Sequence, residues 1–136
     1  MVVLAAWQAW RAVWFFLVSM VGYLALTPQP PASIDLGWDK LNHLSAFAAM
    51  AFAGFFSFPD SVRQRVAMLF VLMAYGGLIE IVQLYIPGRT GEWADLLADS
   101  LGIGIGAAMA MLIMRWLTAN PEFRSVVAGQ APPRED

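Results

Sequence analysis

Three pairs of polar residues interrupt an otherwise apolar sequence, and their spacing could support chemistry. The pairs are Asp39 with His43, Glu80 with Gln83, and Asp95 with Asp99. The members of a pair are three or four residues apart, which places their side chains on the same face of an α-helix. One histidine and four carboxylates brought together could transfer protons, hold a cation or tie helices together through a polar network.

Two basic residues, Lys40 and Arg89, stand close to these pairs in the sequence. The guanidinium group of Arg89 could reach back to a carboxylate as a bidentate partner. Four carboxylates against two basic groups leave a net charge of −2 when His43 is neutral. This surplus favours a bound cation, a shared proton or a protonated His43. In an alternative interpretation, Asp39 and Asp95 only stabilise the starts of two helices.

The composition places the polar pairs in a membrane protein. Of 136 residues, 60% are hydrophobic and only 13% are charged, which is too apolar for a soluble domain of this length. A helix needs about 20 mostly apolar residues to cross a bilayer. Four such runs predict an all-α protein with four transmembrane helices: about Trp10 to Leu26, Leu41 to Phe58, Val66 to Ile86 and Asp95 to Leu117.

The distribution of arginine predicts the orientation, because basic residues in short loops are retained on the cytoplasmic side. Most of the arginines flank the same ends of the predicted helices: Arg11, Arg63, Arg65, Arg115, Arg124 and Arg134. Both termini should therefore be cytoplasmic, with loops 27–40 and 87–94 outside, and all three polar pairs should lie near the outer end. Residues 1–117 would form the transmembrane domain and residues 118–136 a disordered cytoplasmic tail.

Several classes of site and partner are disfavoured by the sequence. It contains no cysteine, which excludes disulfides and thiolate metal sites, and its net charge of −2 gives no footprint for nucleic acid. One histidine with carboxylates could hold zinc, but no HExxH-type spacing is present, so neither a metal nor a cofactor is expected. The first apolar run lacks the features of a cleaved signal peptide and is expected to be retained.

Small residues recur at every fourth position of the last predicted helix. They are Ala98, Gly102, Gly106 and Ala110. Such a stripe allows two helix backbones to approach closely, so it predicts a helix contact rather than a ligand site.

The polar pairs, with the residues around them, resemble a known family. The matching segments are Asp39-Lys40-x-x-His43, Glu80-x-x-Gln83 followed by Pro-Gly-Arg89, and Asp95-(x)3-Asp99-(x)2-Gly102-(x)3-Gly106. In this order and spacing, the chain resembles the VanZ-like family of small membrane proteins over about residues 36 to 110. Asp99 departs from the pattern, since the family typically has Asn at this position.

The resemblance implies a multi-pass protein of the bacterial cytoplasmic (inner) membrane, with a role in the cell envelope. The family takes its name from a protein associated with resistance to the glycopeptide antibiotic teicoplanin. It implies no particular reaction or ligand, so the chemistry has to come from the residues.

Three functions fit the residues to different degrees. In the first, the outer cluster binds a lipid-linked envelope intermediate or an amphiphilic antibiotic, with Lys40 and Arg89 meeting phosphate or carboxylate groups. In the second, the protein is an enzyme in which His43 and Glu80 act as acid and base on a lipid or glycolipid. The third, transport, is disfavoured because the polar residues gather at one end. The alternative to all three is a polar network that only holds helices together.

Overall fold

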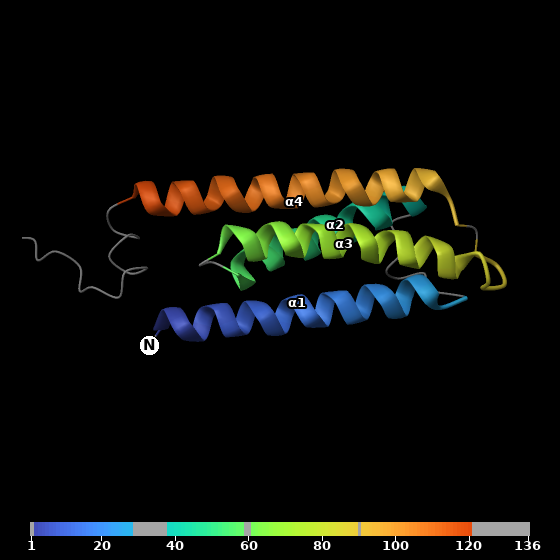
Figure 1. Ribbon diagram of the computed structural model, residues 1–136, viewed down its shortest axis with the longest axis horizontal. Coiled ribbons are helices and arrows are strands. Elements are labelled where there is room, and N and C mark those ends of the chain that lie inside the picture. The colour runs from blue at the N-terminus through green and yellow to red at the C-terminus, as the bar shows by residue number, and fades with distance from the viewer. Residues whose placement is uncertain (1, 29–37, 59–60, 90, 121–136) are drawn as a thin grey trace, which may run out of the picture.

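The described residues form a bundle of α-helices. The computed structural model describes residues 2–28, 38–58, 61–89 and 91–120. The helices are α1 (Val2–Leu26), α2 (Asp39–Ser57), α3 (Val62–Gln83) and α4 (Trp93–Ala119). They run alongside one another in alternating directions, so the start of α1 and the end of α4 lie at the same end of the bundle (Figure 1). The predicted all-α class is confirmed, and most of the predicted tail lies outside the described residues.

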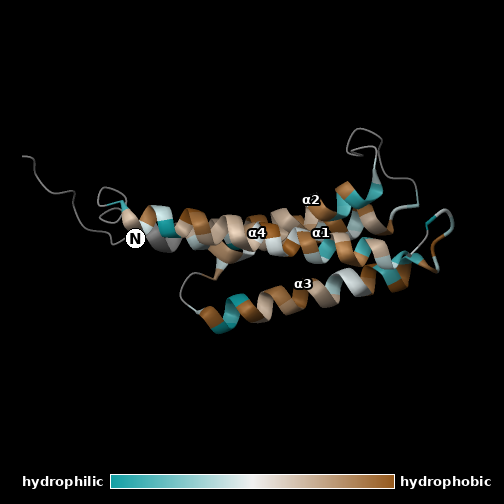
Figure 2. Ribbon diagram, turned by 90° about the horizontal axis from the view of Figure 1, so that it is seen from above, coloured by the Kyte–Doolittle hydropathy of each residue, from teal (hydrophilic) through white to brown (hydrophobic). Residues whose placement is uncertain are grey.

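Three of these helices are long and apolar enough to cross a membrane: α1 over Ala6–Leu26, α3 and α4. Hydrophobic residues occupy most of their length, and hydrophilic ones gather toward the ends (Figure 2). α2 falls outside this set because its polar start, with Asp39, Lys40, Asn42 and His43, lowers its mean hydropathy. The fourth span and the orientation of the termini therefore stay predictions.

α2 is the helix around which the others pack, since it contacts α1, α3 and α4, and its largest contact is with α4. At that interface a Cβ atom on Gly102 would collide with the carbonyl group of Leu44, and one on Gly106 with that of Ala48. The two helices thus meet backbone against backbone. The predicted close contact along the stripe of small residues is confirmed.

Two arginines hold the C-terminal end of α2. Arg11 donates from Nε to the Ser57 carbonyl over 3.1 Å, and Arg65 donates from Nε to the Phe58 carbonyl over 3.0 Å. These carbonyls have no partner within the helix, and a guanidinium group is favourable at the negative end of the helix dipole. This end of the bundle is the one that the sequence predicts to be cytoplasmic.

Topology can be tested with fusions at the two ends of the bundle. A reporter fused after Asp136 is expected to be active in the cytoplasm, while a tag inserted at Gly91 should be accessible from outside, because the arginines set the inward end. In the measurement, each position is fused in turn to two enzymatic reporters. One is active only in the cytoplasm and the other only outside. A C-terminus on the outer side would reject this placement of the polar residues.

Candidate functional site

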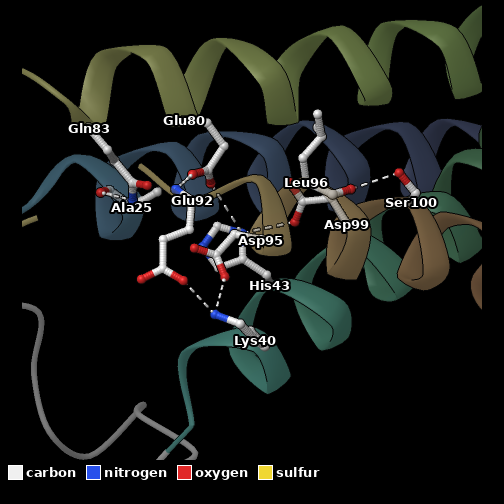
Figure 3. A network of polar contacts seen from close by, with 10 residues as sticks. All are labelled: Ala25, Lys40, His43, Glu80, Gln83, Glu92, Asp95, Leu96, Asp99 and Ser100. Atoms are coloured by element: carbon white, nitrogen blue, oxygen red, sulfur yellow. Dashed lines mark hydrogen bonds and ion pairs between the residues drawn. The ribbon is translucent and has the colours of Figure 1, made fainter. Parts of the chain in front are cut away.

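Polar side chains from three helices converge where α2 begins, α3 ends and α4 begins (Figure 3). α2 contributes Lys40 and His43, α3 contributes Glu80, and α4 contributes Asp95 and Asp99. We call these five residues the polar cluster. The three faces that the sequence spacing defines meet here because each helix starts or stops at this end.

His43 is the centre of the buried part of the cluster. Its Nδ1 atom lies 2.9 Å from Oδ1 of Asp99, at hydrogen-bond distance, and 3.8 Å from Oε1 of Glu80. Asp99 is fully buried, and His43 and Glu80 are each only 9% exposed. We call these three residues the inner triad. An imidazole ring beside two carboxylates can exchange a proton with either of them or share a cation with both.

Three buried carboxylate oxygens of the cluster accept no hydrogen bond within the part of the chain that the structure describes. They are Oε1 of Glu80, Oδ2 of Asp95 and Oδ2 of Asp99. A buried charged oxygen without a donor is unfavourable, so native proteins nearly always satisfy such atoms. A cation or a shared proton beside His43 would satisfy Oε1 of Glu80.

A glycine on α3 makes room for Asp99. A Cβ atom on Gly76 would lie 2.5 Å from Oδ2 of Asp99. Gly76 precedes Glu80 by four residues on the same helix, so both face α4. The sequence pattern does not reveal this role, because a glycine within an apolar helix gives no sign of the side chain that packs against it.

Lys40 and Glu92 form the outer rim of the cluster. Lys40 Nζ lies 2.8 Å from Oε2 of Glu92 and 3.3 Å from Oδ1 of Asp95. The backbone N–H of Glu92 donates to Oε2 of Glu80 over 2.8 Å. Glu92 is not part of the polar pairs in the sequence because it precedes α4. It lies at the N-cap of α4 with an extended backbone, where helix spacing gives no signal for it.

Two overlapping groups of side chains have the composition and spacing to hold a metal ion. One is the inner triad, and the other consists of Asp39, His43 and Asp95; within each group, one ligand atom per residue lies within 4.8 Å of the others. Asp39 is exposed at the first turn of α2, whereas Asp95 is fully buried. The inner triad is therefore the more enclosed of the two.

Gln83 and Arg89 bind the end of α1 instead of the cluster. Gln83 Nε2 donates to the Ala25 carbonyl over 2.9 Å. Arg89 Nη2 donates to the carbonyls of Leu24 and Thr27, over 2.9 and 3.0 Å. Among the described residues, the guanidinium group of Arg89 thus binds backbone carbonyls at the end of α1, which lack partners within their own helix, and not a carboxylate.

A shallow groove of about 190 Å³ lies between the starts of α2 and α4, beside the cluster. Its lining is apolar except for Lys40 and includes Trp38, Leu41, Leu44, Ala94, Leu97 and Leu101. Trp38, Leu97 and Leu101 are each more than 60% exposed. An ammonium group at an exposed apolar groove suits an amphiphile.

Three helices long and apolar enough to cross a bilayer, in a bundle with a buried polar cluster at one end, indicate a helical membrane protein. The chain belongs to the VanZ/LLP1 family, whose family model matches residues 2–115. The resemblance noted in the sequence is thereby confirmed. Comparisons with curated proteins and with solved structures found no match.

Proposed function

We propose that the protein sits in the bacterial cytoplasmic (inner) membrane and binds a lipid-linked envelope intermediate at its outward-facing end. The observation that carries this proposal is the groove between α2 and α4, with Lys40 as its charged lining residue. The hydrocarbon chain would lie against the exposed apolar side chains, and the phosphate group would meet Lys40.

The size and charge of the groove favour a lipid over a bulky amphiphilic antibiotic. Pockets for drug-sized ligands typically enclose about 300–1,000 Å³, whereas this groove has about 190 Å³ and suits part of one chain. An ammonium group has three donors, and Lys40 uses two of them, on Glu92 and Asp95. Because those carboxylates share its charge, the apolar chain would supply most of the binding free energy.

Lipid binding can be measured on the purified protein in detergent. The probes are a polyprenyl phosphate and the polyprenol of the same chain length, compared by native mass spectrometry. Lys40→Met should weaken binding of the phosphate by about tenfold and leave the alcohol unchanged. Ala94→Phe should weaken both probes because it fills the groove.

Leu112→Phe is the matched control, because Leu112 is an exposed α4 residue that does not line the groove. Equal retention of both probes by all three variants would contradict the proposal. If the unmodified protein binds the alcohol as tightly as the phosphate, the groove binds only the hydrocarbon chain. Lys40 then does not recognise the phosphate group.

One observation favours an enzyme as the second candidate. The His43 imidazole is hydrogen-bonded to the buried Asp99 and has Glu80 at 3.8 Å. Asp99 would orient the ring, and His43 and Glu80 would transfer protons as acid and base on a lipid or glycolipid. Conversion of a bound lipid by the protein would distinguish this activity from binding alone.

A further inference from the structure

We propose that the inner triad of His43, Glu80 and Asp99 is a binding site for a divalent transition-metal ion, and that Zn²⁺ is the ion its donors fit best. The proposal goes beyond lipid binding and does not depend on it, because the triad and the groove use different side chains.

The separations between the donor atoms suit one small ion. One ligand atom from each of the three residues lies within 4.8 Å of the other two. His43 Nδ1 is 2.9 Å from Asp99 Oδ1 and 3.8 Å from Glu80 Oε1. Two ligand atoms bound about 2.1 Å from one zinc ion at a tetrahedral angle lie about 3.4 Å apart. The two observed separations fall on either side of this value, so small side-chain movements would complete the site.

The unsatisfied oxygens point independently to a cation. Among the described residues, Oε1 of Glu80, which faces Nδ1 of His43, accepts no hydrogen bond. Oδ2 of the fully buried Asp99 also lacks a donor there, on the side of the carboxylate that packs against Gly76. Polar atoms in such positions are normally satisfied by a protein group, water or an ion. A metal ion would bind Glu80 Oε1 directly and would also replace the single hydrogen bond between His43 and Asp99.

The charges near the inner triad favour the binding of a divalent cation. The two carboxylates of the triad are buried, while the nearby basic side chains bind other acceptors. Lys40 contacts Glu92 and Asp95, and Arg89 contacts carbonyls of α1. A divalent ion would neutralise both carboxylates without moving either basic residue.

The donor types select among divalent ions. Mg²⁺ and Ca²⁺ prefer shells made only of oxygen, whereas imidazole nitrogen favours zinc and other transition metals. Three protein ligands with room for a fourth from solvent or substrate is the pattern of an open zinc site. Glu80 is further oriented by the N–H of Glu92, which holds its second oxygen.

Metal binding is tested on the full chain, purified in detergent without added lipid. After removal of bound metal with a chelator, titration calorimetry should show one Zn²⁺ per chain, with at least about a hundredfold weaker binding of Mg²⁺ and Ca²⁺. His43→Gln, Glu80→Gln and Asp99→Asn should each weaken Zn²⁺ binding by at least about tenfold. Cobalt substitution gives a second readout, because a four-coordinate site yields strong visible absorption that these variants should lose.

Asp39→Asn separates the inner triad from the overlapping group that contains Asp39 and Asp95. Zn²⁺ affinity should be retained in this variant, and a loss as large as that of Glu80→Gln would overturn the assignment to the inner triad. Absence of Zn²⁺ binding to the unmodified protein, or equal binding of Mg²⁺, would overturn the proposal whatever the variants do. Since no lipid is present, failure here leaves the lipid-binding proposal standing.

Discussion

Glu80→Gln is expected to abolish the function of the protein in cells while the chain still inserts and folds. Glutamine keeps the size of the side chain and an oxygen that can accept from the Glu92 N–H, but it removes the negative charge beside His43. A working carboxylate needs that charge for proton transfer or cation binding, whereas a purely structural network tolerates a neutral acceptor. The measurement is drug susceptibility or envelope integrity in a deletion strain complemented at matched membrane abundance.

His43→Gln should match Glu80→Gln, because the two side chains belong to one triad. The double variant should be no worse than either single variant, a non-additivity that independent packing contacts do not show. Ile81→Leu is the matched control, since Ile81 is the neighbour of Glu80 on α3 and is 58% exposed. Full complementation by both single variants would reject a functional role for the triad.

Gly102→Leu and Gly106→Leu are expected to cause the largest losses of stability. In each case the new side chain would meet a backbone carbonyl of α2, at Leu44 or Ala48. A backbone cannot move aside as the end of a side chain can. Each variant should therefore lose about 1–3 kcal/mol of unfolding free energy. Thermal melts in detergent should show midpoints lower by at least about 5 °C.

Gly104→Leu is a control within the same helix, because a Cβ atom at Gly104 would have no neighbour within 4 Å. Its melting temperature should stay close to that of the unmodified protein. If all three variants melt alike, α2 and α4 do not meet along this stripe.

The convergence of the polar side chains could be anticipated from the sequence because two local rules act together. Spacings of three and four residues fix which side chains share a helix face. Prolines after each apolar run fix where the helices stop, so the pairs fall at the same end. His43, Glu80 and Asp99 meet for these reasons.

The partners of Arg89 and Gln83 could not be anticipated, because both bind backbone carbonyls of a different helix. Carbonyl groups are the same in every residue, so the sequence of α1 does not show which side chains bind its end. Glu92 could not be anticipated either, because it lies in the connection before α4, where helix spacing gives no information. Gly76 shows the same limit, as only the three-dimensional arrangement places Asp99 against it.

The last carbonyls of α1 are bound by side chains that are synthesised much later than the helix itself. The donors that bind its last carbonyls, on Gln83 and Arg89, lie 58 to 65 residues further along the sequence. Pro28 has no N–H to donate in their place, and the last carbonyls of a helix have no partner within it. The last turn of α1 therefore acquires these donors only after α3 and the connection that follows it have been made, and until then water has to satisfy its carbonyls.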